Sequence, residues 1–352
     1  MTVPAAFAIP GDIETLTGGF IYERRLLEGL RAAGHGVQHI RLAETFPAPS
    51  DEDMAAAIAA LEDVEPTRPL IVDGLVFGAI DTAGLSRVRA PIVAMIHHPL
   101  ALESGLDEAS RIHLFRTERD NLTLAAHVFV PSPHTRRVLV EQYDAKSERI
   151  TVIRPGVEPP SGPPRPAEPP LILSVGILHP RKGHNVLIDA LDRIRQLEWR
   201  AVIVGNAWDP DFAVALERQI DQLDLGGRVR LAGKVPAEEL QDLYQTAAIF
   251  ALATRYEGYG IVFDEALSHG LPIVSCRTGA VPDTVPSSSG MLVPADDPDA
   301  FAAALARLLQ DRDLRATLAE AALRAGADAP SWADQARLAG AVLDTLAAER
   351  LG

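Results

Sequence analysis

The chain has 352 residues, of which 47% are hydrophobic, and it carries a formal net charge of −15 at pH 7. This length is sufficient for two domains of ordinary size, and the acidic balance argues against nucleic-acid binding and against a basic membrane-docking face. The single cysteine, Cys276, excludes an intramolecular disulfide and a metal site built from several cysteines.

The start of the chain shows no basic segment followed by an apolar one, which a secretory signal would need. The apolar runs are all far shorter than a membrane span. We therefore expect a cytoplasmic protein that does not associate with membranes.

In the first half of the chain, short apolar segments alternate with amphipathic helical segments, which is typical of a mostly parallel sheet covered on both faces. The predicted strands are residues 3–9, 37–42, 70–73, 91–96, 127–130 and 150–153. A loop leads from the first strand into a helix that begins at Gly18 and Gly19 and ends before Gly34. The paired glycines would allow a ligand phosphate to approach closely, although an ordinary helix entry explains them equally well.

His97 and His98 directly follow the predicted strand 91–96. They therefore lie at the carboxyl edge of the sheet, where ligands bind in open α/β folds, and we expect one of them to face a ligand. Two alternatives remain. The pair could bind a metal, for which the sequence offers no third ligand in register nearby, or it could satisfy only backbone groups.

Residues 159–170 contain seven prolines. A central strand or helix cannot form there, so we predict a stiff linker between a first domain at residues 1–158 and a second domain at residues 171–330.

The second half repeats the alternation, with predicted strands at residues 171–175, 200–204, 229–232, 247–253 and 272–275. Arg181 and Lys182 lie in the loop after the first of these strands, just before a helix. Two adjacent cations there would neutralise a bound diphosphate. A solvent-exposed basic pair is the simpler alternative, and only the position of the loop at the ligand-binding edge favours the site.

The segment at residues 255–272 has the sequence RYEGYGIVFDEALSHGLP and follows an apolar strand. Its glycines precede a short helix from about Ile261, whose first turn would favour an anion such as phosphate. Glu257 in the loop and Glu265 in the helix flank this position, and as hydrogen-bond acceptors they suit sugar hydroxyls. The alternative is one solvated and one capping glutamate.

Glu257 and Glu265 with the seven residues between them resemble the Glu-x7-Glu signature of the family 4 retaining glycosyltransferases, which have the GT-B fold. The resemblance covers nearly the whole chain. Gly18-Gly19 resembles the opening of these enzymes, the strand ending in His97 resembles their His-Asp or His-Ala strand end, and Pro-Arg181-Lys182-Gly resembles their diphosphate-binding loop.

The resemblance implies an α/β protein with two Rossmann-like domains that face each other across a cleft. The acceptor would bind residues 1–158, the donor would bind residues 171–330, and a final helix at residues 331–352 would cross back to the first domain. The implied reaction is the transfer of a hexosyl group from a nucleoside diphosphate sugar to an acceptor hydroxyl, with retention. It requires neither a metal nor another cofactor, and the acceptor is a small molecule or a glycan.

The resemblance also implies a set of site residues. The implied catalytic residues are His97, Arg181, Lys182 and Glu257. The implied donor-binding residues are Gly18, Gly19, Arg181, Lys182, Val235, Glu257, Gly258, Tyr259, Gly260, Ile261, Val262 and Glu265. Asp209-Pro-Asp211 and Asp297-Pro-Asp299 match the Asp-x-Asp pattern of metal-dependent glycosyltransferases, but both lie where an aspartate caps a helix, so we expect no metal there.

Two other functions remain open. A GT-B sugar-nucleotide epimerase or phosphorylase shares the two-domain design, although the three lysines leave few positions for a lysine-bound pyridoxal group. A non-catalytic protein with two hinged domains could bind the same sugar or nucleotide. Formation of free nucleoside diphosphate would separate an enzyme that transfers the sugar from such a binding protein.

Overall fold

The structure is a computed structural model that describes residues 2–103 and 105–351. The chain forms two compact units, one from Met1–Gly156 with Pro330–Gly352 and the other from Val157–Ala329. The ends of the predicted domains at Met1 and Gly352 lie outside the described residues.

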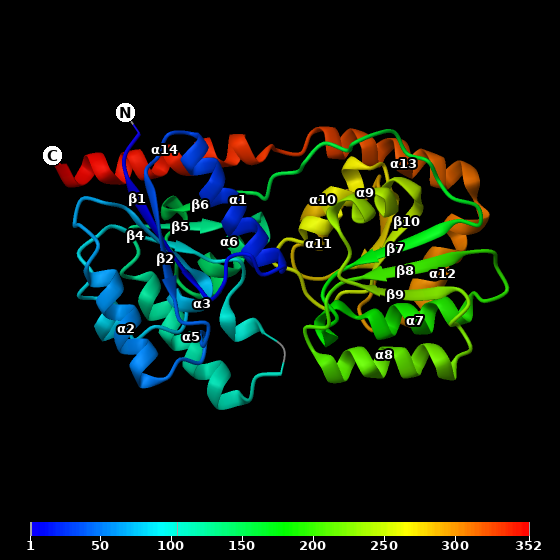
Figure 1. Cartoon of the computed structure of the whole chain (residues 1–352), viewed down its shortest axis with the longest axis horizontal. Helices are drawn as coiled ribbons and strands as arrows, with labels where there is room; N and C mark the ends of the chain where they lie inside the picture. The colour runs from blue at the N-terminus through cyan, green and yellow to red at the C-terminus, as the bar shows by residue number, and fades with distance from the viewer. Residues whose placement is uncertain (1, 104, 352) are drawn as a thin grey trace. The chain divides into compact units, whose positions relative to one another are not determined.

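The first unit contains a sheet of six parallel strands in the order β2-β1-β3-β4-β5-β6 (Figure 1). The strands are β1 (Ala5–Pro10), β2 (Val37–Leu42), β3 (Leu70–Asp73), β4 (Ile92–Met95), β5 (His127–Val130) and β6 (Ile150–Val152). The chain passes from β1 to β2 and then returns to β3 on the other side of β1. The loops after β1 and β3 therefore lead away from each other, which makes this the switch point of the sheet.

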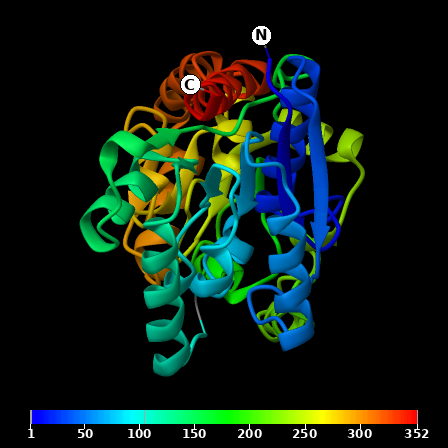
Figure 2. The ribbon, with the colours of Figure 1, turned by 90° about the vertical axis from the view of Figure 1, so that its left-hand side faces the viewer.

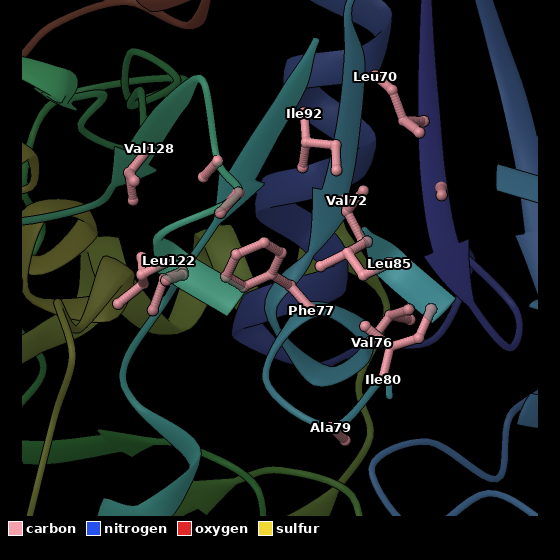
Figure 3. Packing of buried hydrophobic residues seen from close by; sticks show 14 of the residues in the cluster. Leu70, Val72, Val76, Phe77, Ala79, Ile80, Leu85, Ile92, Leu122 and Val128 are labelled. Carbon is pink, nitrogen blue, oxygen red and sulfur yellow. The ribbon is translucent and has the colours of Figure 1, made fainter. Parts of the chain in front are cut away.

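Helices cover both faces of this sheet because its strands are apolar on both faces. They are α1 (Gly18–Ala32), α2 (Asp51–Glu62), α3 (Gly74–Phe77), α4 (Thr82–Leu85), α5 (Glu108–Leu122) and α6 (Pro133–Gln142). Ser50, Asp107 and Ser132 cap three of these helices by accepting a hydrogen bond from a backbone N–H three residues later. On one face, Phe77, Leu70 of β3 and Ile92 of β4 belong to the same buried hydrophobic core (Figure 3).

The last helix, α14 (Trp332–Leu351), belongs to the first unit and packs against α1 (Figures 1 and 2). Ser331 accepts a hydrogen bond from the backbone N–H of Asp334 at 3.1 Å and so caps the start of this helix. Small residues allow the close approach, since a Cβ added to Gly29 would lie 2.7 Å from the Cβ of Ala336.

The second unit contains another sheet of six parallel strands, in the order β12-β11-β10-β7-β8-β9. The strands are β7 (Leu171–Val175), β8 (Arg200–Val204), β9 (Val229–Gly233), β10 (Ala247–Leu252), β11 (Ile273–Cys276) and β12 (Gly290–Val293). From β7 the chain proceeds to β8 and β9 on one side and returns to β10 on the other side. The switch point of this sheet therefore lies between β7 and β10.

The helices of the second unit pack on both faces of its sheet. They are α7 (His184–Arg193), α8 (Pro210–Gln222), α9 (Ala237–Thr246), α10 (Ile261–Ser268), α11 (Val281–Thr284), α12 (Pro298–Gln310) and α13 (Arg312–Ala327). Asp209 caps α8 by accepting from the N–H of Phe212 at 3.0 Å, and Asp297 caps α12 by accepting from the N–H of Ala300 at 2.8 Å. The prediction that these two aspartates act as caps is confirmed.

The proline-rich segment at residues 159–170, for which we predict a stiff linker, is hydrogen-bonded to the second unit. The backbone N–H of Arg165 donates to the carbonyl of Gln245 at 2.7 Å, and that of Ala167 donates to the carbonyl of Thr246 at 2.9 Å. These bonds attach the segment to the end of α9, and the first unit ends at Gly156 instead of residue 158. The segment can attach because its non-proline residues retain their N–H groups.

The structure also contains β12, which was not among the predicted strands. Its four residues begin at a glycine and follow three serines, a pattern more typical of a turn. Parallel pairing with the fully buried β11 places it in the sheet. Among the described residues, no helix combines the length and the apolar character needed to cross a membrane.

Two leucines of α14 test whether this helix stabilises the first unit. Leu343 is fully buried, whereas Leu338 is 42% exposed. Leu343→Ala should lower the free energy of unfolding by about 2–5 kcal/mol, because it removes core contacts and leaves a cavity. Leu338→Ala should cost less than about 0.5 kcal/mol. Urea denaturation followed by circular dichroism measures both, and equal losses would show that α14 does not pack as described.

Candidate functional site

The switch point of the second unit brings Arg181, Lys182 and Glu257 together. Arg181 and Lys182 lie in the loop after β7, and Glu257 lies in the loop after β10. The two loops touch, because the backbone N–H of Arg255 donates to the carbonyl of Arg181 at 2.8 Å. The predicted residues of these two loops therefore form one cluster at the edge where α/β sheets bind ligands.

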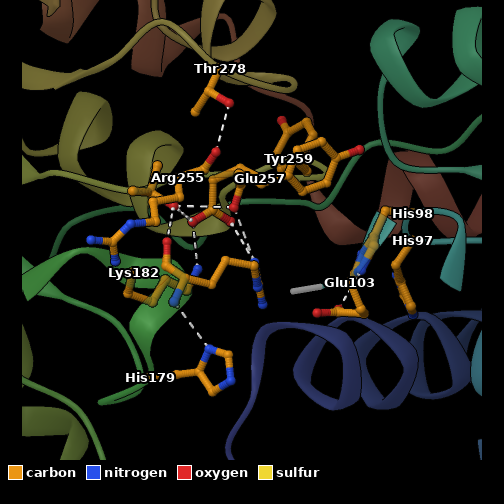
Figure 4. Close-up of polar contacts among 12 residues, drawn as sticks. His97, His98, Glu103, His179, Lys182, Arg255, Glu257, Tyr259 and Thr278 are labelled. Atoms are coloured by element: carbon orange, nitrogen blue, oxygen red, sulfur yellow. Dashed lines mark hydrogen bonds and ion pairs between the residues drawn. The ribbon is translucent and has the colours of Figure 1, made fainter. Parts of the chain in front are cut away.

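Glu257 is the centre of this cluster and is only 4% exposed. Its Oε1 atom accepts from Lys182 Nζ at 2.6 Å and from Thr254 Oγ1 at 3.0 Å (Figure 4). Its Oε2 atom lies 3.9 Å from Arg181 Nη1. Burial alone would raise the pKa of Glu257, but the two cations and these hydrogen bonds hold the pKa below its ordinary value. The carboxylate therefore stays charged at neutral pH.

Glycines allow the loops of this cluster to meet. Gly183 has a φ of +64°, and a Cβ at this position would collide with the carbonyl oxygen of Ala253. Gly279, in the loop after β11, has a φ of +51° and lies directly against the backbone of Glu257. The neighbouring N–H of Ala280 donates to the carbonyl of Glu257 at 2.8 Å. Three loops thus fix the position of one carboxylate.

The loop after Glu257 leads into α10 through Gly258, Tyr259 and Gly260. Gly260 adopts a left-handed conformation at the N-cap, with a φ of +88°, and has no side chain to cap the helix. Ile261 and Val262 form the first turn, where the helix dipole favours an anion. The Tyr259 hydroxyl donates to the buried carboxylate of Asp264, so the Tyr259 side chain anchors the loop to the helix.

Glu265 has a different partner from Glu257. Its Oε2 atom accepts from the Tyr244 hydroxyl at 2.7 Å. Burial raises the pKa of Glu265, although the hydrogen bond from Tyr244 opposes this shift. Val235 follows β9 at the same edge of the sheet and packs against the apolar core that includes Tyr244.

The first unit has its own polar cluster at its switch point, formed by Glu23, Asp73 and His97. Glu23 lies on α1, Asp73 ends β3 and His97 follows β4. His97 Nε2 lies 3.3 Å from Glu23 Oε1 and 3.9 Å from Asp73 Oδ2. The Glu23 and Asp73 side chains are 2% and 4% exposed, whereas that of His97 is 22% exposed.

Burial raises the pKa of Glu23 to about 7, although a hydrogen bond with Asp73 lowers it. Burial raises the pKa of Asp73 well above its ordinary value, and the nearby charge of Glu23 raises it further. Burial lowers the pKa of His97, although the charge of Asp73 opposes this shift. The cluster thus holds two carboxyl groups that resist ionising together beside a neutral imidazole.

The predicted residues around His97 are placed as follows. Gly19 lies against the ring, since a Cβ there would lie 3.6 Å from His97 Cδ2, and Gly18 is the first residue of α1. His98 has a separate partner, with its Nε2 atom 2.5 Å from Glu103 Oε1 (Figure 4). Of the two histidines, His97 is therefore the one that contacts the Glu23–Asp73 pair.

Glu23 and Asp73 were not predicted as partners of His97, since neither lies in helical or strand register with it. The two carboxyl groups and the imidazole offer atoms within 4.8 Å of one another. They come from three separate elements, so no local spacing could reveal them. One signal was available, since Asp73 ends an apolar strand as His97 follows one, at the same edge of the sheet.

Two family descriptions match nearly all of the chain between them. "Glycosyltransferase Family 4" matches residues 17–160, and "Glycosyl transferases group 1" matches residues 160–325. The D-inositol 3-phosphate glycosyltransferase of Corynebacterium glutamicum is 31% identical over 234 residues, which are 60% of this chain and 56% of that protein. The corresponding protein of Xylanimonas cellulosilytica is 34% identical over 228 residues, 59% of this chain and 54% of that protein. The chain spans about half the length of the curated relatives it matches.

Solved structures share the fold. A sucrose-phosphate synthase from Thermosynechococcus elongatus superposes with a TM-score of 0.84 at 22% identity, covering 98% of this chain and 100% of that chain. Anabaena HepE in complex with UDP-glucose superposes with a TM-score of 0.76 at 17% identity, covering 98% and 100%. At these identities the likeness establishes the two Rossmann-like domains of the GT-B fold.

The ion pair between Lys182 and Glu257 yields a test of the cluster. Lys182→Met should lower the free energy of unfolding by about 3 kcal/mol, because it leaves a buried carboxylate without its closest cation. Adding Glu257→Gln to this variant should restore part of the loss, since the charge is then also removed. Lys234→Met, at an exposed lysine of the same unit, is the control. Denaturant titration checks all three, and a Lys182→Met loss no larger than the control would contradict the pairing.

Proposed function

The chain belongs to the family 4 glycosyltransferases of the GT-B fold, and from this premise we propose that it transfers a hexosyl group from a nucleoside diphosphate sugar to an acceptor hydroxyl, with retention at the anomeric carbon. The observation that carries the proposal is the cluster of Arg181, Lys182 and Glu257 at the switch point of the second unit. It combines cations for a diphosphate with a charged acceptor of hydrogen bonds for a sugar.

Arg181 and Lys182 are proposed to bind the diphosphate of the donor, beside the first turn of α10. When the bond between the anomeric carbon and the phosphate oxygen breaks, negative charge develops on the diphosphate. Fixed cations and a helix start that are already in place stabilise this charge without reorganising, which is usually the largest contribution to such catalysis. The donor would then share Lys182 with Glu257.

Glu257 is proposed to bind hydroxyl groups of the transferred sugar. Its pKa is held low, so it accepts charge-assisted hydrogen bonds, which are stronger than neutral ones. The same cations make it a weak nucleophile, which argues against the covalent role that a carboxylate has in retaining glycosidases. The proposed path for the acceptor proton is to the departing phosphate oxygen on the same face of the sugar.

Glu265 is proposed to bind the ribose of the donor. A carboxylate has two oxygens with two lone pairs each, so Glu265 can accept from ribose hydroxyls while it keeps its bond to Tyr244. Val235 at the end of β9 is proposed to contact the nucleobase through its backbone. The proposed donor-binding set also includes Gly258, Tyr259, Gly260, Ile261 and Val262, with Gly18 and Gly19 from the first unit.

His97 of the first unit is proposed to act on the acceptor side. It stands at the carboxyl end of β4 beside the switch point of its sheet, where a ligand of the first unit would bind. The relatives are named for transfer to D-inositol 3-phosphate, and HepE was solved with UDP-glucose. These names support a small polyol or sugar acceptor and a uridine diphosphate sugar as the first substrates to test.

The decisive experiment incubates the protein with nucleotide sugars and polyol or sugar acceptors and measures released nucleoside diphosphate and the glycoside formed. NMR spectroscopy determines the anomeric configuration of the product. Transfer with retention supports the proposal. A rise in melting temperature with the donor, without release of nucleoside diphosphate, would indicate a binding protein. Conversion of the donor in the absence of an acceptor would indicate an epimerase. A requirement for free phosphate would indicate a phosphorylase.

Glu265→Gln should weaken nucleotide binding by about 10- to 100-fold, because the amide keeps the shape but loses a charge-assisted bond of roughly 1.5–3 kcal/mol. The melting temperature should change little. Glu217→Gln, an exposed position of the same unit, should leave nucleotide binding unchanged. Isothermal calorimetry with the nucleoside diphosphate measures both variants, and wild-type affinity in Glu265→Gln would reject the ribose assignment.

We propose that no metal or other cofactor takes part, because the two cations of the cluster already match the charge of a diphosphate. Transfer should therefore continue at its full rate in excess EDTA. A rate that falls in EDTA and returns with magnesium or manganese would show instead that a metal stabilises the leaving group.

A further inference from the structure

We infer that Glu23 and Asp73 share one proton and, through it, hold His97 in a single tautomer, so that the three side chains form one acid–base unit in the first unit. This inference deepens the proposed function and rests on it for the role of His97. Glu23 and Asp73 are positioning residues here, since they would act through the imidazole and not on the substrate.

The geometry requires a proton between the carboxyl groups. Both side chains are almost fully buried, and a carboxyl oxygen of each lies within 4.8 Å of the other and of the His97 ring nitrogen. Two ionised carboxylates are both acceptors and repel each other at this separation, so one of them keeps a hydrogen. Asp73 has a further partner, because it caps α3 by accepting from the N–H of Leu75 at 2.9 Å. Its other oxygen can carry the hydrogen, and burial together with the charge of Glu23 raises the pKa of Asp73 well above its ordinary value, so Asp73 is the member that keeps the hydrogen.

The pair also determines the state of the imidazole. His97 Nε2 faces Glu23 Oε1 at 3.3 Å, so the arrangement favours a hydrogen on Nε2. In a neutral imidazole the Nδ1 atom is then the acceptor. This atom can accept a hydrogen bond from a hydroxyl of the acceptor other than the attacking one, whose hydrogen passes to the phosphate oxygen, and it can thereby orient the acceptor for transfer.

The neighbours of the cluster described below are uncharged, so the protonation states of Glu23, Asp73 and His97 depend on one another. The Tyr22 ring lies edge-on to His97, at 5.2 Å between ring centroids, and its hydroxyl donates to the carbonyl of Ile153. From α6, Thr135 donates its hydroxyl to the carbonyl of His97 at 3.3 Å. Among the described residues, the charged groups that act on Glu23, Asp73 and His97 are these three themselves.

The pH dependence follows from the shared proton. In wild-type protein Glu23 ionises as the pH rises through about 7, which leaves one proton on the pair, held by Asp73, and places a single negative charge beside His97. Turnover should rise along this acid limb, because the ionised Glu23 is the stronger acceptor for the hydrogen on Nε2. Glu23→Gln keeps a hydrogen donor toward Asp73 and an oxygen toward His97, but it cannot ionise. This variant should stay active near neutrality and should lose the acid limb near pH 7.

Removal of the carboxyl group should behave differently. Glu23→Ala should lower kcat about 10- to 100-fold at every pH, as loss of an orienting partner of a histidine typically does, and should leave the KM for the nucleotide sugar nearly unchanged. If Glu23→Gln retains turnover and Glu23→Ala loses it, the two results together support a positioning role for Glu23. Equal pH profiles in wild-type protein and Glu23→Gln would overturn the shared proton.

A second measurement does not depend on activity. In protein labelled with ¹⁵N-histidine, the resonances of His97, assigned through His97→Gln, should show a neutral ring with its hydrogen on Nε2 near pH 7. The Nδ1 tautomer or a charged ring would overturn the inference while leaving the proposed function intact. Glu103→Gln, which alters the neighbouring His98 pair, should not change the His97 signals.

Metal binding is the competing outcome for this cluster. Zinc or manganese added at micromolar concentration should leave the His97 resonances unchanged. A perturbation that Glu23→Gln abolishes would show that the three side chains bind a cation and would overturn the shared proton.

Discussion

The structure depends on one constraint, which is that a carboxylate buried at the end of a parallel strand must be neutralised. An isolated ionised group in such a place costs several kcal/mol, so it acquires a counter-charge or keeps its proton. The second unit uses the first solution, since Lys182 and Arg181 surround Glu257 and hold its pKa down. The first unit uses the second solution, since Glu23 and Asp73 have no lysine or arginine partner in the part of the chain that the structure describes, and their pKa values rise. The same topology thus yields two sites of opposite chemistry.

The backbone makes both solutions possible. At a switch point the loops diverge and leave room for side chains, but the side chains meet only if the backbones approach closely. Gly183 and Gly279 provide this approach around Glu257, because a Cβ at either position would overlap a neighbouring backbone. Gly74 has a comparable place in the first unit, where a Cβ would lie 2.8 Å from the carbonyl of Met95, just before His97. Glycines at these strand ends are therefore part of the sites as much as the charged residues are.

The sequence was informative where a single segment contains the whole signal. Apolar strands followed by glycines placed Lys182 and Glu257 at the same edge of one sheet, and the structure joins them at 2.6 Å. The pattern could not reveal the Glu23–Asp73 pair, because a glutamate in an amphipathic helix is usually solvated and its burial depends on a strand about fifty residues further along the chain. Glu118 on α5 is a similar case: the segment predicts a solvated face, but this residue is fully buried. Tertiary packing determines whether such a residue is buried, and the local sequence pattern does not contain this information.

The two sites divide the proposed chemistry in a physically consistent way. Departure of a diphosphate creates negative charge, and the second unit provides fixed cations that are already desolvated and partnered. Orientation of the acceptor molecule requires a fixed hydrogen bond acceptor but little charge, and the first unit provides an imidazole kept neutral by burial. An imidazolium would donate where a lone pair is required, and a solvated histidine would change its protonation state within the physiological range. The proposed role of the buried acid pair is therefore one that a simple apolar pocket would lack, since the pair would support a neutral ring in one orientation and this ring would hold a hydroxyl of the acceptor without competition from a second proton.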